Sequence, residues 1–352
     1  MQLFSSFSWR RRDMLAAAKY GALNARLRTR AGRLPSVHHF QRLLEAPTSK
    51  TVVEVLREAN VPTPEDGSLP SRQWLLAQWL VPDYHVVLRR ISGSAQRLVQ
   101  SLMDRLELEN VKYAVRAIAS GKSIKTKTLL NLGKVATVNI KALERVQRMS
   151  DLQLAVKRTV FAVPLRTTAP LWEEGEGLFA VESALDRAVY TSLQKTAEGF
   201  RGPGAVPVQR IIDQLVATVS LLWMVRYRLA YGLTPEAAAG LSLIKSSQRT
   251  AHHIRQLSHA ATFEEFRSAI QTMTEMEYYQ NGGTLLEWER HLLSRIRKMA
   301  HTMLHGPPFG FSVVVGFLLL KEWAIRDLAL ICQGRTVGLR AEVLGPMLFH
   351  DD

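Results

Sequence analysis

Hydrophobic residues recur every three or four positions along most of this chain, which is the period of an amphipathic α-helix. Tyr20, Leu23, Leu27 and Leu34 show the spacing near the start. Strand-like alternation between Gly and Asn turns is scarce, so the pattern predicts an all-α protein. Proline and glycine interrupt helices, and they predict breaks at Pro62 to Pro70, Pro164 to Pro170, Gly199 to Pro207, Asn281 to Gly283 and Gly306 to Gly310.

A repeat organises the pattern further. When the chain is shifted by 111 positions, "VRAIASGKSIKTKTLLNLGK" from Val115 aligns without a gap with "RYRLAYGLTPEAAAGLSLIK" from Arg226. Each copy predicts a long helix that stops at a glycine, then a short helix and two more helices. The matched pairs include Ala119 with Ala230, Gly121 with Gly232, Leu130 with Leu241, Leu132 with Leu243 and Lys134 with Lys245.

A further, shortened copy is predicted near each end of the chain. Near the C-terminus, Asp327 precedes Gly338 by 11 positions, as Asn110 precedes Gly121. We therefore predict three pseudo-repeated helical units packed side by side, because similar small units bury their apolar faces against one another. Their predicted bounds are residues 1–105, 106–205 and 206–352. The alternative is that amphipathic helices of similar composition match by chance.

The opening stretch "SWRRRDMLAAAKYGALNARLRTR" resembles a twin-arginine export signal at first sight. Such a signal needs an uninterrupted apolar segment, and Lys19 breaks the run that follows Met14. A mitochondrial presequence is harder to exclude, because the stretch is rich in arginine and poor in acid. The helical spacing favours the interpretation that Met14 to Leu34 is the retained first helix of the folded protein.

Composition narrows the class of protein. The chain is 47% hydrophobic and 22% charged, as in ordinary folded proteins, and its single cysteine, Cys332, excludes an internal disulfide. The net charge of +15 points to an anionic partner, which is nucleic acid, an anionic lipid surface or an acidic protein. The apolar runs Leu215 to Val225 and Phe309 to Leu320 are shorter than the roughly 18 residues that span a bilayer, so no membrane crossing is expected.

Two groups of residues resemble ligand-binding motifs but give little support for a binding site. "SGKS" at Ser120 to Ser123 lacks the earlier glycine of a phosphate-binding loop, since position 116 is Arg116, so we expect Lys122 to be solvated. The histidines at 38, 39, 252, 253 and 259 have neither metal-ligand spacing nor helper ligands, and they are expected at the surface. No metal, cofactor or catalytic residue is predicted.

Charged residues at helical spacing are more informative. Glu182 and Asp186 lie four apart on one helix face, and we expect them to pair with Arg187 or with basic residues of neighbouring helices. Glu322 and Arg326 are an i, i+4 pair in the favourable order, at the end of an apolar run.

Aromatic residues alternate with arginines in "WMVRYRLAY", Trp223 to Tyr231, and RNA-binding surfaces use such a mixture. The favoured interpretation is structural. Trp223 and Tyr227 are expected to face the core, while Arg226 and Arg228 extend their charged ends to solvent.

Three segments together resemble the C subunit of the V/A-type rotary ATPases, which is the counterpart of the d subunit in eukaryotic V-ATPases. They are the opening "KYGALNARLRTRAGRL", the central "LFAVESALDRAVYTSLQKTA" from Leu178, and the closing "FGFSVVVGFLLLKEWAIRDLALICQGRTVGL" from Phe309. This chain has Asp327 where many relatives have asparagine. The residues that match the family pattern or the repeat glycines are Gly121, Glu182, Asp186, Tyr190, Gly232, Lys321, Glu322, Arg326, Gly334 and Gly338.

The resemblance implies a funnel of three similar helical units that does no chemistry itself. Such a protein lies on the cytoplasmic face of the membrane, without a transmembrane segment, and couples the rotor ring to the central shaft. Its expected partners are ring subunits, shaft subunits and, peripherally, the anionic membrane surface, with Arg10, Arg11 and Arg12 near the membrane side. The main alternative is a basic helical-repeat module that binds nucleic acid, which the resemblance does not lead us to expect.

Overall fold

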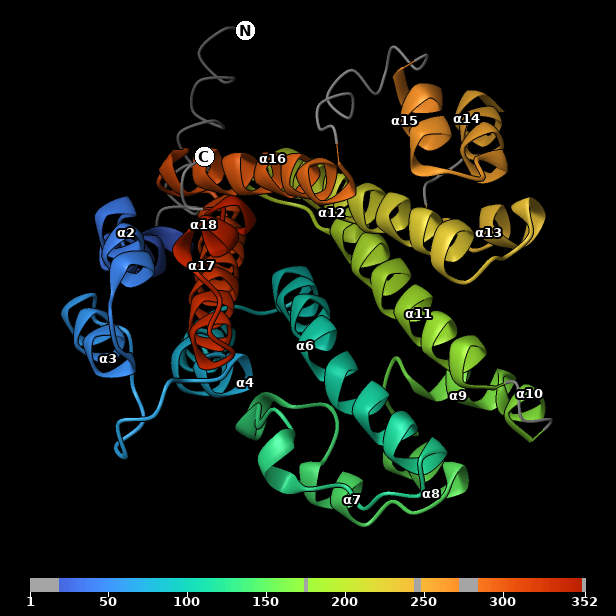
Figure 1. Ribbon diagram of the computed structural model, residues 1–352, viewed down its shortest axis with the longest axis horizontal. Helices are drawn as coiled ribbons and strands as arrows, with labels where there is room; N and C mark the ends of the chain where they lie inside the picture. Colours follow the sequence, from blue (N-terminus) through green and yellow to red (C-terminus); the bar gives the residue numbers. More distant parts are fainter. Residues whose placement is uncertain (1–18, 174–176, 244–247, 272–283, 350–352) are drawn as a thin grey trace, which may run out of the picture.

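The computed structural model describes residues 19–173, 177–243, 248–271 and 284–349. Every regular element in these ranges is a helix, which confirms the predicted all-α class (Figure 1). Shorter helices are arranged around the long ones, which therefore set the architecture. The long helices are α6 (Ser94–Ala119), α11 (Gly177–Gly199), α12 (Ala205–Val225), α16 (Leu285–His305) and α17 (Ser312–Thr336).

The first part of the chain contains a helix at 19–31, then α2 (Val37–Glu45) and α3 (Ser49–Glu58). After the predicted break at 62–70, α4 (Arg72–Leu75), η1 (Leu76–Leu80) and α5 (Val81–Leu88) form one continuous helix. Its middle is a π-turn, in which the Val81 N–H bonds to Leu76 five residues back. Pro82 follows at once and has no N–H to donate, which favours this irregular turn.

Short elements link α6 to α11. They are η2 (Thr126–Thr128), η3 (Gly133–Val135), α7 (Ile140–Glu144), α8 (Met149–Ala155), α9 (Ala162–Thr167) and α10 (Ala169–Glu173). The predicted break over Pro164 to Pro170 is wrong, since two helices cover it and only Thr168 separates them. Both prolines lie in the first turn of their helices, where the missing N–H would have had no partner within the helix.

The next part follows the same scheme. α12 continues into η4 (Arg226–Ala230), and α13 (Pro235–Gly240), α14 (Gln248–His259) and α15 (Phe263–Gln271) lead on to α16. The chain closes with α17, α18 (Ala341–Leu344) and η6 (Gly345–Met347). The predicted breaks at 199–207 and 306–310 separate long helices as expected, whereas 281–283 lies outside the described residues.

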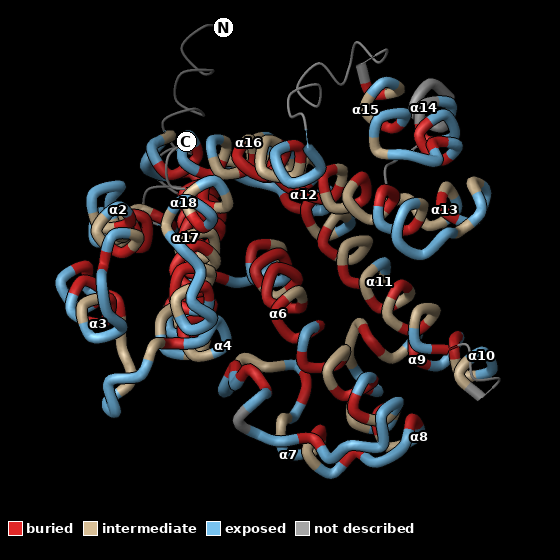
Figure 2. Tube along the Cα trace, in the orientation of Figure 1, coloured by how far each residue is buried: buried red, intermediate tan, exposed pale blue. Residues whose placement is uncertain are grey.

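Three clusters of buried side chains form the core. One lies between α6 and α11 and joins residues 108–189, and another joins residues 221–292 of α12, α14, α15 and α16. The largest surrounds α17 and gathers residues from 20–106, 193–216 and 293–349. Buried residues accordingly run along most of α17 in Figure 2, and the first helices of the chain pack against the last.

The first helix is an integral part of this core. Tyr20, Leu23 and Leu27 are buried, as their spacing predicted, but the helix ends at residue 31, before Leu34, and residues 14–18 lie outside the described residues. The Asn24 amide donates to the backbone oxygens of Pro308 at 2.7 Å and Gly310 at 2.9 Å, which fixes the helix to the loop before α17. The three arginines at 10–12 lie outside the described residues.

The two longest apolar stretches, in α12 and α17, are both used in the core, but to different extents. The segment Ala205–Ala230, which is α12 with η4, is long and apolar enough to cross a membrane by composition alone. Within the protein, however, 56% of its most apolar window is buried against other helices, so its apolar character is largely used in the core. The run in α17 is almost wholly buried.

Candidate functional site

Glu182 and Asp186 face α6, where two cations meet them. Lys112 Nζ lies 2.9 Å and 3.0 Å from the two Asp186 oxygens. Arg116 donates Nε to Glu182 at 2.6 Å and a second nitrogen at 2.9 Å, a two-pronged contact. The predicted pairing with basic residues of a neighbouring helix is confirmed. Because the residue numbers rise along α6 as they fall along α11, the two helices are antiparallel.

Burial sets the electrostatics of this contact. It raises the pKa of Asp186 above its ordinary range, although Lys112 opposes the shift. Hydrogen bonds to Glu182 raise the pKa of Arg116. A carboxylate that is held by a lysine between two helices is a clamp rather than a free acid or base. The arrangement therefore fixes α6 against α11.

Arg105 forms a second junction, one that sequence reasoning missed. It projects from α6, and its guanidinium lies 2.8 Å from the Glu322 carboxylate of α17. Burial alone would lower the pKa of Arg105, but Glu322 together with nearby Tyr190 and Tyr84 raises it, so this buried group stays charged. Glu322 thus pairs with α6, and the expected partner one turn along its own helix, Arg326, has other contacts.

Tyr190 extends this junction to α11 and α12. Its ring meets Trp223 edge to face, with 5.4 Å between the ring centres. Burial raises the pKa of Tyr190 to about 12, against the opposing effect of Arg105, so the phenol stays neutral at cellular pH. Two residues of the family pattern, Tyr190 of α11 and Glu322 of α17, thus both lie near Arg105.

Lys321, next to Glu322, makes a third junction. Its ammonium lies 2.5 Å from Asp83 of α5 and 4.5 Å from the centre of the Trp79 ring in η1. Arg30 of the first helix also contacts Asp83, whose side chain is only 1% exposed. Burial lowers the pKa of Lys321, as does Arg30. One carboxylate therefore ties the first helix and α17 to α5.

The end of the chain is fixed by Arg326 and Asp327. The Phe349 backbone N–H donates to the Asp327 carboxylate at 2.9 Å, and the Arg326 guanidinium lies 4.1 Å from the centre of the Phe349 ring. Burial raises the pKa of Asp327 to about 6. An asparagine oxygen could accept the same hydrogen bond, which accounts for either residue at this position.

The predicted glycine stops have the backbone that they require. Gly121, Gly232 and Gly338 follow long helices with φ of +64°, +62° and +77°, where residues with a Cβ are strained. The fourth family glycine, Gly334, acts by size, because a Cβ there would come within 2.4 Å of the Leu344 side chain. It therefore lets α18 pack directly on α17.

A polar residue 11 or 12 positions before each glycine stop fixes the segment that folds back. Asn110 accepts from the Leu130 N–H at 2.7 Å and donates to its carbonyl at 2.8 Å. The Ser220 hydroxyl accepts from Leu243 N–H at 2.9 Å, and Asp327 accepts from Phe349. In each of α6, α12 and α17, a polar side chain therefore hydrogen-bonds to the backbone of the segment that follows the helix.

The other candidates behave as structural residues. Lys122, His38, His252 and His259 are exposed, and the side chain of His253 is not described. Among the described residues, no group of three or more His, Cys, Asp or Glu could hold a metal ion. The structural interpretation of Trp223 to Tyr231 is confirmed for Tyr227, which is buried, and for Arg226, which is exposed. It is wrong for Arg228, which is half-buried and donates to the backbone oxygen of Leu233.

The residues that complete these junctions are Asp83, Arg105, Lys112 and Arg116. They lie 53 to 238 positions from their partners, so no local spacing could identify them. The one available signal was a cluster of charges inside an otherwise apolar helix, in "LVQSLMDRLELENV" of α6. Ionised groups on a buried face require partners from another element.

Comparison with known proteins supplies the identity of this arrangement. A model of the ATP synthase (C/AC39) subunit family matches residues 23–345. The C subunit of the A-type ATP synthase of Methanocaldococcus jannaschii is 21% identical over 97% of this chain and 88% of its own length. That of Methanothermobacter thermautotrophicus is 23% identical over 92% and 86%, and that of Haloquadratum walsbyi 22% over 90% and 94%.

These similarities cover almost the full length on both sides, and family residues on α11 and α17 lie in the ion pairs and ring contacts described above. The chain therefore belongs to the ATP synthase (C/AC39) subunit family and is a non-catalytic stalk subunit of that rotary complex.

Proposed function

We propose that this chain couples the membrane rotor ring to the central shaft of its ATP synthase and transmits torque between them. A part with that task must be stiff, because a soft connector would store the rotation instead of passing it on. The observation that carries the proposal is the set of buried ion pairs around α17, Arg105–Glu322 and Lys321–Asp83. They hold three helices of distant sequence, α5, α6 and α17, in one body.

The same proposal includes a pseudo-repeat. Under the shift of 111 positions, η2 corresponds to α13, α7 to α14 and α8 to α15. Leu143 and Ile254 are matched and both buried, as are Val146 and Leu257. The shared glycine stops and the hydrogen bonds of Asn110, Ser220 and Asp327 support the interpretation. Units that pack in this way around a common axis would give the funnel that the family resemblance implies.

The unit bounds at 1–105, 106–205 and 206–352 stay predictions. The core clusters favour different unit bounds, in which α16 and α17 do not both belong to the third unit. α17 and the later part of α16 share a core cluster with residues 20–106, so we assign both to the first unit, whereas the first part of α16 belongs with residues 221–292. The two ends of the chain would then complete a single unit, which would close the structure between its first and last helices.

The proposed partners are ring subunits at one end of this body and shaft subunits at the other, with the anionic membrane surface nearby. The net charge of +15 supports contact with acidic groups on these partners. Arg10, Arg11 and Arg12 are proposed to lie on the membrane side, where each cation gains roughly 1 kcal/mol near anionic lipid.

The test is to isolate the protein from its own membranes in mild detergent and to identify by mass spectrometry what accompanies it. We expect ring and shaft subunits in fixed proportion, with an intact mass that includes residues 1–30. A soluble protein that carries nucleic acid, with affinity falling steeply as salt rises, would instead support the nucleic-acid-binding alternative that the +15 charge favours. That result would overturn the coupling role.

A further inference from the structure

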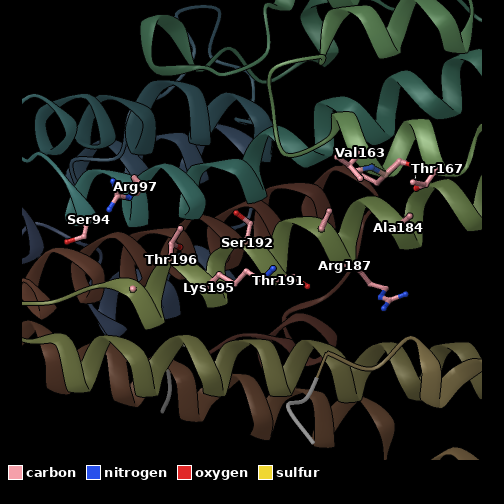
Figure 3. Close-up of a pocket in the computed structure, with 13 residues that line it drawn as sticks. Ser94, Arg97, Val163, Thr167, Ala184, Arg187, Thr191, Ser192, Lys195 and Thr196 are labelled. Carbon is pink, nitrogen blue, oxygen red and sulfur yellow. Dashed lines mark hydrogen bonds between the residues drawn. The ribbon is translucent and has the colours of Figure 1, made fainter.

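A groove runs along the exposed side of α11, away from the junctions. It encloses about 660 Å³ between α11, the first turn of α6 and α9. In Figure 3, Ser94 and Arg97 lie at one end and Val163 and Thr167 at the other, with Ser192 between them on α11. Glu182 and Asp186 of α11 contact α6 and Tyr190 contacts Trp223 of α12, so this surface has no part in the contacts described so far.

The charges at the groove are all of one sign. Arg97, Arg187 and Lys195 line it, all three are exposed, and the described residues that line it include no carboxylate. Glu182 and Asp186 lie on the other face of α11, where cations of α6 pair with them. Arg187 and Lys195 of α11 are therefore not paired with Glu182 or Asp186, and the third cation, Arg97, is contributed by α6.

The start of α6 adds to the same field. Its N-cap is Gly93, which offers no side-chain oxygen to the first N–H groups of this 26-residue helix. Uncapped N–H groups and the helix dipole together place a partial positive charge beside Ser94. An anionic group at this end would satisfy donors that the protein itself leaves open.

The shape of the groove fits a helix. Along α11 its floor is made of small residues at helical spacing, Ala184, Ala188, Ser192 and then Gly199. Small residues on one ridge let a second helix approach closely, and the stretch measures about 22 Å at 1.5 Å per residue, or roughly four turns. Val163, 56% exposed, gives the rim an apolar contact that a bound helix would cover.

We propose that this groove docks an acidic amphipathic helix of another protein, with its small apolar face on the α11 ridge and its carboxylates on Arg97, Arg187 and Lys195. A phosphate backbone or a lipid headgroup would use the cations but would leave the apolar floor uncovered. A flat bilayer would also meet a concave surface poorly. This docking surface goes beyond the proposed ring and shaft contacts and does not depend on them.

The test is direct binding to the full chain. The probe is a fluorescently labelled helical peptide of about 20 residues built from Glu, Ala and Leu, and its counterpart has Lys in place of Glu. Reversing two groove charges, Arg97→Glu with Lys195→Glu, should weaken binding of the acidic peptide about tenfold or more. The matched control reverses Lys141 and Arg145 near α7, which changes the net charge equally outside the groove.

A third variant separates shape from charge. Ala188→Phe fills the floor without changing any charge, and it should also abolish peptide binding while helical content and melting temperature stay unchanged. The proposal is overturned if groove and control variants bind the peptide equally, or if Ala188→Phe has no effect. It is also overturned if phosphatidylserine vesicles or a single-stranded oligonucleotide bind the groove more tightly than the peptide and lose affinity in all groove variants.

Discussion

At the scale of single residues, the protein keeps ionisable groups in places where burial costs free energy. Asp104 of α6 is 8% exposed, and one of its oxygens has no hydrogen-bond partner within the described structure. Burial, with a further contribution from Glu107, raises its pKa to about 7. A carboxyl group of this kind destabilises the folded state when it is ionised, and it therefore links folding to pH.

We predict that Asp104→Asn removes a pH-dependent penalty. Between about pH 4 and pH 7 the folded state binds more protons at this site than the unfolded state, so its contribution to stability falls as pH rises. The variant should therefore gain about 1–3 kcal/mol over wild type at pH 8 and much less at pH 5. Urea denaturation at the two pH values measures this.

The control is Asp213→Asn at an exposed position of α12, which should shift stability equally at both pH values. A gain from Asp104→Asn that is the same at pH 5 and pH 8 would mean that the effect comes from packing rather than from titration.

A second prediction concerns the hydrogen bond that closes the chain. Asp327→Ala leaves the buried Phe349 N–H without an acceptor and should cost about 1–3 kcal/mol. Asp327→Asn keeps an acceptor oxygen and should lose less than half of that. Chemical denaturation at pH 7.5, where the wild-type carboxyl is ionised, compares the two variants. Equal losses would show that the charge opposite Arg326 matters more than the hydrogen bond.

At the scale of elements, the antiparallel pair of α6 and α11 is held by two ion pairs on one face. The side chains of Lys112 and Asp186 are each 13% exposed, so both lose most of their hydration. Removing either partner leaves the other buried charge poorly compensated, and breaking such a pair is costly even where its net contribution is small.

We predict a positive coupling energy between these two residues. Lys112→Ala and Asp186→Ala should each destabilise by about 2–3 kcal/mol, and the double variant should lose about 1–2 kcal/mol less than the sum. Thermal unfolding of the four proteins completes the cycle. The same cycle on Arg42 and Glu58, an exposed pair between α2 and α3, should give a smaller coupling. Strict additivity at Lys112 and Asp186 would contradict the clamp.

Sequence reasoning was most successful with elements whose signals are local. Helical spacing predicted the class, and the glycines at 121, 232 and 338 predicted where long helices stop. It failed at Pro164 to Pro170, because proline does not interrupt a helix when it lies in the first turn. The partners of Glu322 and Lys321 were out of reach, since both pairs depend on how distant helices pack.

At the scale of the whole molecule, the junctions converge on α17, which brings the last part of the chain against the first. Among the residues of these junctions, Arg105 has the most neighbours from other helices. It lies beside Glu322, Tyr190 and Tyr84, which belong to three different helices. Under the proposed coupling role, a load applied to α6 would pass to α5, α11 and α17 through these buried contacts. Stiffness is thus built from a few long-range charges set in an otherwise apolar core.

The Arg105–Glu322 pair allows stability and coupling to be tested separately. Glu322→Ala leaves a buried guanidinium without its partner and should cost about 3–5 kcal/mol. Arg105→Met combined with Glu322→Leu removes both charges and should recover most of that loss, because apolar groups of similar size fill the space. Melting temperatures compare the two proteins.

If the Arg105–Glu322 pair also transmits torque, complexes assembled with the double variant should hydrolyse ATP normally but move fewer ions per ATP. Wild-type ion transport in that complex, with both charges absent, would mean that packing alone transmits the rotation.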